Sequence, residues 1–92
     1  MTNMTVNTEH ELMQRLVDPE RCGWSNQAAQ AVLQLHFSSE DRVRASDLAD
    51  RANQGLLSEA DQREMESYLR LGTFIDLMQS KARLFLREQK AA

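Results

Sequence analysis

The residues from Ser58 to about Glu88 keep a helical pattern throughout, and this stretch limits the fold more than any other part of the chain. No proline interrupts it, and a helix of about thirty residues is roughly 45 Å long at ~1.5 Å per residue. Ser58 is a good N-cap, and Glu59 places negative charge at the positive end of the helix dipole. We therefore predict a single long C-terminal helix over about residues 59–88.

The preceding residues predict three short helices. Each begins after a hydroxyl side chain that can accept a backbone N–H of the first turn, and these N-caps are Thr8, Ser25, and Ser38 or Ser39. The first helix ends before Pro19, the second spans residues 26–35 and the third spans about residues 40–53. We expect a turn or loop over residues 18–23, and Gly55 as the left-handed residue after the third helix.

No segment shows the alternation of apolar and polar residues that is typical of a strand. We therefore predict an all-α fold with three short helices and one long C-terminal helix, arranged as a helical hairpin or a small bundle. A chain of 92 residues makes one domain. We expect a disordered N-terminus at residues 1–7 and a single helical domain over residues 8–92.

We expect neither a signal peptide nor a membrane span in this sequence. The N-terminus has no basic leader with an apolar core, so it is not a signal peptide, and no run approaches the ~20 apolar residues of a membrane span. The single cysteine, Cys22, excludes an intrachain disulfide and suits a reducing compartment. We expect a soluble cytoplasmic protein that does not enter a membrane.

The long helix is more apolar than a helix buried on one side requires. One broad face carries the apolar residues Leu71, Phe74, Ile75, Met78, Ala82, Phe85 and Leu86. Leu77 and Leu84 project from the opposite side, whereas a core-facing stripe needs a width of only about 100°. Either the short helices wrap around the long helix and cover both sides, or Leu77, Leu84 and neighbours such as Phe85 form an interface. Because the short helices are thin and alanine-rich, we predict a homodimer or a complex with a partner protein.

Gly72 is unfavourable in the interior of the long helix, where it costs roughly 1 kcal/mol relative to alanine. A close approach by a neighbouring element, or a kink, would offset that cost. We expect the alanine-rich segment 26–35 to cross the long helix at this glycine.

The sequence contains no constellation that is typical of catalysis or metal binding. His10, His36 and Cys22 cannot form the usual structural zinc site, and no nucleotide-binding or nucleophile-elbow motif is present. The acids near the start of the long helix are explained by its dipole. We predict no catalytic residue, no metal ligand and no cofactor, and we expect the protein not to be an enzyme.

The basic residues near the C-terminus suggest an alternative function. Lys81, Arg83, Arg87 and Lys90 could contact phosphate groups in a small nucleic-acid-associated protein. Against this, the net charge is −3, and acids occupy the first turn of the long helix, where a recognition helix contacts the duplex. We do not expect the chain alone to bind nucleic acid as its main role.

Residues 38–87 resemble a group of small uncharacterised bacterial helical proteins with the approximate pattern G-x-L-T/S-x-E…Y-x-x-L-G…L-L/M-Q-S-K-A-R. The matching positions are residues 51–60, Glu64, Glu66, residues 68–72 and residues 77–83. The match through Gly72 and residues 79–83 is moderately specific, whereas the capping turn before it is generic. Ser58 stands where threonine is common, and Met78 where leucine is common.

Genes of this group often lie beside a gene for an HNH-type or other nuclease-like protein. The resemblance therefore implies a non-enzymatic interaction module that acts as an antitoxin or accessory protein and restrains a nuclease-like partner. It implies no catalytic residues. It makes Gln79, Ser80, Lys81 and Arg83 candidate partner contacts, although the same residues also fit a solvated polar face of the helix.

Overall fold

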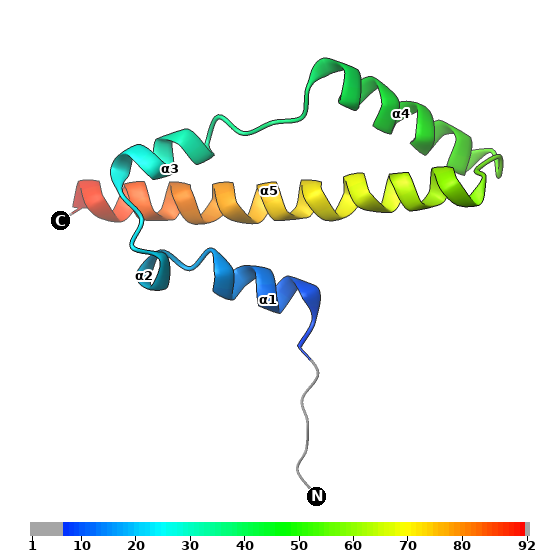
Figure 1. Ribbon diagram of the computed structural model, residues 1–92. Coiled ribbons are helices and arrows are strands. Elements are labelled where there is room, and N and C mark those ends of the chain that lie inside the picture. The colour runs from blue at the N-terminus through cyan, green and yellow to red at the C-terminus, as the bar shows by residue number, and fades with distance from the viewer. Residues whose placement is uncertain (1–6, 92) are drawn as a thin grey trace, which may run out of the picture. The chain divides into compact units, whose positions relative to one another are not determined.

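The computed structural model describes residues 7–91, without the side chains of residues 21, 22 and 91. All regular structure in this range is helical, so the predicted all-α class is confirmed (Figure 1). The helices in chain order are α1 (Glu9–Leu16), α2 (Pro19–Cys22), α3 (Asn26–Val32), α4 (Ser39–Asn53) and α5 (Glu59–Ala91). The disorder expected at residues 1–7 falls, up to residue 6, outside the described residues.

The chain packs as two compact units. Unit 1 comprises residues 1–34 and 76–92, and its described part holds α1, α2, α3 and the C-terminal half of α5. Unit 2 comprises residues 35–75 and holds α4 and the N-terminal half of α5. The single domain expected over residues 8–92 stays a prediction, because a division by packing does not show whether the units unfold together.

A one-turn helix replaces the turn or loop predicted at residues 18–23. The Asp18 carboxylate accepts the backbone N–H of Glu20 at 3.0 Å and caps α2. Pro19 occupies the first helical position, where its fixed φ is favourable and no N–H is needed. Gly23 ends the helix in the left-handed region with a φ of 62°. Proline thus ends the preceding helical pattern and also begins a new turn of helix.

Helix α3 ends at Val32, three residues before the predicted end. The Gln34 N–H bonds to the Ala31 carbonyl at 3.0 Å, which tightens the last turn. The Gln79 side chain on α5 donates from Nε2 to the Val32 carbonyl at 3.3 Å. A side chain from another helix thus satisfies a C-terminal carbonyl of α3, a contact that local sequence patterns do not reveal.

The turn between α4 and α5 follows the prediction closely. Gly55 has a φ of 71°, as expected for a left-handed residue after a helix. Its N–H bonds to the Ala52 carbonyl at 3.1 Å, and the Leu56 N–H bonds to the Arg51 carbonyl at 2.9 Å. These two bonds form a Schellman motif. The Ser58 hydroxyl then accepts the Asp61 N–H at 3.1 Å and caps α5 as predicted.

Few apolar side chains are buried among the described residues. The buried ones are Val17, Ala29, Leu48 and Ala82. Of these, only Leu48, in unit 2, is a large side chain that is fully buried. Beside α4, the rings of Phe37 and Tyr68 meet edge to face with centroids 5.6 Å apart. Unit 1 therefore relies on smaller buried side chains than unit 2 does.

Gly72 does not serve the close helix crossing that its sequence position suggested. A Cβ built on Gly72 would meet only Phe37 within 4 Å among the described residues, with Cε2 at 3.8 Å. That distance is an ordinary van der Waals contact, and the neighbour is an aromatic ring of unit 2 rather than the backbone of α3. An alanine would therefore fit at this position.

None of the helices within residues 7–91 combines the length and the apolar character needed to span a membrane.

Candidate protein-interaction surface

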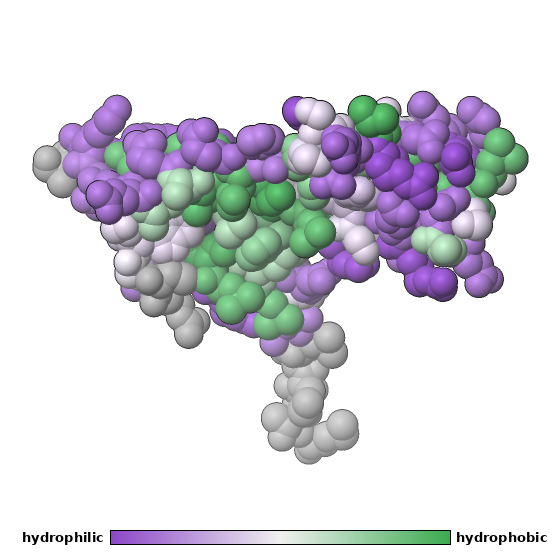
Figure 2. Space-filling view, turned by 45° about the horizontal axis from the view of Figure 1, so that its top comes forward, coloured by the Kyte–Doolittle hydropathy of each residue, from purple (hydrophilic) through white to green (hydrophobic). Residues whose placement is uncertain are grey.

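Large apolar side chains remain uncovered in both units. Those that are exposed are Leu12, Leu16, Leu35, Val43, Leu56, Leu69, Leu71 and Leu84. Figure 2 shows apolar side chains gathered where unit 1 carries α1, whereas the surface over α4 in unit 2 is mostly hydrophilic. Five of these eight side chains belong to unit 2, but the gathering over α1 makes the apolar surface of unit 1 the first candidate for an interface.

Helix α1 contributes a continuous part of this surface. Leu12 is 46% exposed and Leu16 is 67% exposed, and residues four apart lie on the same side of a helix. Met13 is half-buried and Val17 is buried, so the adjacent side of α1 packs inward. Thr8 caps the helix, because its hydroxyl accepts the Glu11 N–H at 3.1 Å. A well-formed helix thus presents two leucines to solvent.

The two leucines predicted to form an interface differ in exposure. Leu84 is 43% exposed, whereas Leu77 is half-buried. Leu71, which was placed on the broad apolar face of the long helix, is also exposed. Leu84 is therefore the better placed of the two predicted leucines to contact a partner, and this role stays a prediction.

Leu84 lines an open pocket of about 250 Å³, which we call the acidic pocket. Its lining residues are Asp18, Pro19, Glu20, Lys81, Leu84, Phe85 and Glu88. Residues 81, 84, 85 and 88 share one side of α5 because they are three or four positions apart. The pocket brings together three of the predicted partner contacts, Lys81, Leu84 and Phe85. Three carboxylates and one lysine surround its apolar lining.

Phe85 and Gln79, which were predicted as partner contacts, also hold unit 1 together. The Phe85 ring lies against the Trp24 ring with centroids 6.4 Å apart and planes inclined at 51°. Gln79 donates to the Val32 carbonyl, as described above. Substituting either residue would therefore change the fold of unit 1 as well as any interface.

A second open pocket, of about 310 Å³, lies on the other side of α5. We call it the basic groove, and its lining residues are Leu33, Arg83, Leu86, Arg87 and Lys90. Residues 83, 86, 87 and 90 again share one side of the helix by their spacing. The groove brings together three of the four predicted basic residues. Lys81 is the exception, because it lines the acidic pocket instead.

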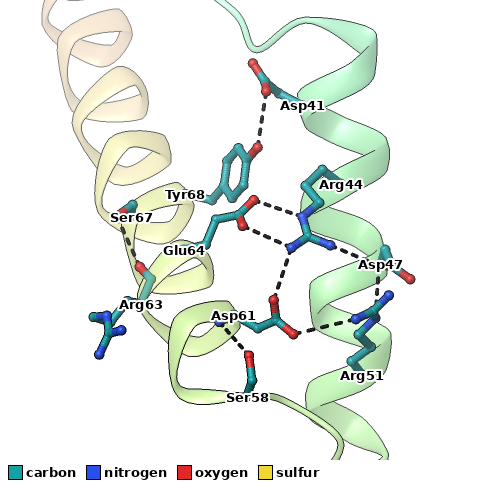
Figure 3. A network of polar contacts seen from close by, with 10 residues as sticks. All are labelled: Asp41, Arg44, Asp47, Arg51, Ser58, Asp61, Arg63, Glu64, Ser67 and Tyr68. Carbon is teal, nitrogen blue, oxygen red and sulfur yellow. Dashed lines mark hydrogen bonds and ion pairs between the residues drawn. The ribbon is translucent and has the colours of Figure 1, made fainter.

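Two arginines of unit 2, Arg44 and Arg51, are bound by acids, in contrast to the arginines of the basic groove. Arg44 on α4 binds Glu64 on α5 through two nearly parallel contacts, Nε to Oε2 at 2.9 Å and Nη2 to Oε1 at 3.0 Å. It also contacts Asp61 at 3.1 Å and Asp47 at 3.4 Å. Arg51 contacts Asp47 at 3.1 Å and Asp61 at 3.6 Å (Figure 3). This network joins α4 to the first two turns of α5.

The network shifts the pKa values of its members in the directions expected for paired charges. The hydrogen bond from Arg44 lowers the pKa of Glu64 against the opposing effect of desolvation. Desolvation would raise the pKa of Asp61, but hydrogen bonds from Ser58 and the charges of Arg44 and Arg51 outweigh it and lower the pKa. The hydrogen bond to Glu64 is the main cause that raises the pKa of Arg44. All three groups therefore stay ionised near neutral pH, as fits a structural role.

Tyr68 extends this polar cluster. Its hydroxyl donates to Asp41 at 3.1 Å (Figure 3). Desolvation by burial raises the pKa of Tyr68, and the hydrogen bond to Asp41 raises it further. Tyr68 thus holds the start of α4 against α5, on the opposite flank of the network from Arg51.

Within the part of the chain that the structure describes, no three His, Cys, Asp or Glu side chains are grouped as ligands for a metal ion. Comparisons with protein-family models, with curated proteins and with solved structures give no match.

Proposed function

We propose that this protein is a non-enzymatic protein–protein interaction module that associates through unit 1. The observation that carries the proposal is the contrast between burial and exposure. Leu48 is the one large side chain among the described residues that is fully buried, whereas Leu12, Leu16 and Leu84 are all exposed in unit 1. Burying such side chains at an interface contributes about 25 cal/mol per Å² of apolar surface. A partner would therefore stabilise a chain that has little core of its own.

Two kinds of partner fit this proposal. A second copy would bury the apolar surface of unit 1 in a homodimer. The resemblance to small bacterial proteins encoded beside nuclease genes makes a nuclease-like protein the first heterologous partner to test, with restraint of its activity as the antitoxin-like role. The single cysteine suits a reducing compartment, so we place this association in the cytoplasm.

Molar mass in solution tests the proposal directly. Light scattering over a range of concentrations is expected to give about 21 kDa, twice the 10.6 kDa of one chain. Alternatively, the chain forms a stable complex with a co-expressed nuclease-like protein. Leu16→Glu combined with Leu84→Glu should abolish either complex while keeping the helical circular-dichroism signal, because both side chains are exposed in the single chain.

Val43→Glu is the matched control. Val43 is 70% exposed and belongs to α4, the helix whose visible surface is mostly hydrophilic in Figure 2. This substitution is expected to leave the complex intact. A wild-type chain that remains at 10.6 kDa and binds no nuclease-like protein would contradict the proposal.

A second candidate function is nucleic-acid association. It is supported by the basic groove, where Arg83, Arg87 and Lys90 line one pocket and none of its lining residues is acidic. A DNA or RNA probe should then shift in a gel, and affinity should fall steeply with salt as counterions are released. Lys81→Ala should have little effect, because Lys81 lies in the acidic pocket. No shift at low salt would exclude this candidate.

A further inference from the structure

We infer that the basic groove receives helix α1 of a second copy of this chain. This inference rests on the proposed function, because it specifies how the module associates with itself. The groove and the helix both belong to unit 1. The groove offers cations beside apolar side chains, whereas the helix offers carboxylates beside exposed leucines.

The groove has cations without acidic partners. Arg83, Arg87 and Lys90 make no ion pair or hydrogen bond with the other residues that the structure describes. Arg44 and Arg51 in unit 2, by comparison, are satisfied by three carboxylates. Leu33 and Leu86 add apolar surface between the cations of the groove. A ligand that fits these features combines carboxylates with apolar side chains, as an acidic amphipathic helix does.

Helix α1 has that combination. Glu9 lies three residues before Leu12, so it shares the exposed side of α1 with Leu12 and Leu16. Glu11 is also in the first turn, but it lies about 100° around the helix from Leu12 and so flanks that side. With Arg15 in the last turn, the helix carries a net negative charge. The exposed side of α1 therefore offers two leucines and one glutamate, with a second glutamate on its flank, to the two leucines and three cations of the groove.

A single chain does not satisfy its own groove with this helix, because Leu12 and Leu16 both remain exposed. In a pair of chains related by a twofold axis, α1 of each copy can enter the groove of the other. Such reciprocal contacts are self-complementary and close the assembly at two copies. Because each helix–groove contact occurs twice, a short helix can contribute to an interface of ordinary size, about 800 Å² per partner.

The apolar lining favours a protein helix over a phosphate backbone. A surface that binds nucleic acid without sequence preference tracks the backbone with cations and stacks the bases on aromatic side chains. The groove offers two leucines and no aromatic ring. The net charge of the chain, −3, also disfavours a phosphate backbone as the ligand of the groove.

Paired charge reversals test this inference. The first variant carries Arg83→Glu and Arg87→Glu, which makes the groove acidic. The second carries Glu9→Lys and Glu11→Lys, which makes α1 basic. Each variant alone should dissociate, with a dimer Kd weakened by about tenfold or more, because like charges then face each other. An equimolar mixture should recover the dimer mass, since both reciprocal contacts become complementary again.

Recovery in the mixture separates an interface effect from misfolding, because two misfolded chains would not restore each other. Arg63→Glu with Arg70→Glu is the control, since it changes the net charge equally on the same helix but in unit 2. It should leave the mass unchanged.

Three results would overturn the inference. If the wild-type dimer survives both reversals but is lost in the Leu16→Glu, Leu84→Glu variant, the groove does not receive α1 and the proposed function stands. If the wild type is monomeric at all concentrations, self-association is excluded and only a heterologous partner remains for the proposed function. If the groove reversal abolishes binding of a nucleic-acid probe without changing molar mass, the groove belongs to nucleic acid.

Discussion

The two units differ in how some of their arginines are paired. In unit 2, Arg44 and Arg51 are bound by acids of the same chain, and Leu48 of α4 is fully buried. In unit 1, Arg83 and Arg87 line an open groove with no acidic lining residue, and leucines of α1 are exposed. The comparison teaches that the N-terminal half of α5 helps to form an ion-pair network within the chain, whereas the C-terminal half lines an open basic groove, on which the further inference rests.

The largest expected difference between the units is in their cores. Leu48→Ala should lower the free energy of unfolding by about 2–5 kcal/mol, because it removes a large, fully buried side chain and leaves a cavity. Val17→Ala in unit 1 should cost only about 1–2 kcal/mol, because Val17 is smaller. Urea unfolding followed by circular dichroism measures both. Equal losses would contradict the view that unit 2 holds the main core.

The helix caps provide the next comparison. Ser58→Ala should cost about 1 kcal/mol, because it removes the acceptor for the Asp61 N–H at the start of α5. Ser58→Thr keeps an oxygen at that position and should cost much less. Ser25→Ala removes the cap of α3 in unit 1, where the hydroxyl accepts the Ala28 N–H at 3.0 Å, and should have a similar cost. Indistinguishable stability of Ser58→Ala and Ser58→Thr would argue against the cap.

Two glycines of unit 2 should respond with opposite signs. Gly72→Ala is expected to stabilise the protein by up to about 1 kcal/mol, because the new Cβ fits against Phe37 and a helical glycine is unfavourable. Gly55→Ala should destabilise it by a similar amount or more, because φ is 71° at that residue. Thermal unfolding compares the two variants under one condition. A destabilising Gly72→Ala would show that the ring of Phe37 cannot accept the methyl group.

Acid should weaken unit 2 through its ion-pair network, and this effect should be smaller than those of the substitutions above. The pKa values of Asp61 and Glu64 are lowered on folding, so the unfolded chain binds protons more readily than the folded chain. The contribution is complete above the unfolded values of 3.8 and 4.5 and is lost as pH falls below them. Unfolding measured from about pH 6 to about pH 3 should show less acid sensitivity in Arg44→Gln than in the wild type.

At high pH the sign reverses for Tyr68. Its pKa is raised on folding, so its contribution is complete below the unfolded value of 10.0 and is lost as pH rises through the folded value. Tyr68→Phe should remove this alkaline sensitivity. If the variant keeps the wild-type profile, another group causes it.

Local signals in the sequence predicted the helices well. Hydroxyl residues mark the starts of α1, α3, α4 and α5, and Gly55 marks the end of α4, because caps depend on residues that are neighbours along the chain. The early end of α3 was missed because its carbonyl is satisfied by Gln79, 47 positions away. The one-turn helix α2 was missed because Pro19 was interpreted only as a terminator.

The candidate site was predicted less completely than the fold. Sequence reasoning grouped Lys81 with Arg83, Arg87 and Lys90, although helical spacing alone places Lys81 on the other side of α5. It assigned no role to Leu12 and Leu16, because their exposure depends on which side of α1 packs inward. The ion pairs of Arg44 with α5 could not be predicted, because they depend on how α4 packs against α5 and no local sequence pattern indicates that packing.

The ring contacts have a practical consequence for following this molecule. The chain has one tryptophan and one tyrosine, and each sits in a different unit: Trp24 beside Phe85 in unit 1, and Tyr68 beside Phe37 in unit 2. Intrinsic fluorescence therefore carries a separate, label-free signal for each unit. Coincident transitions of the two fluorophores would show that the shared helix α5 makes unfolding cooperative, whereas a tryptophan transition that moves alone with protein concentration would report assembly at unit 1.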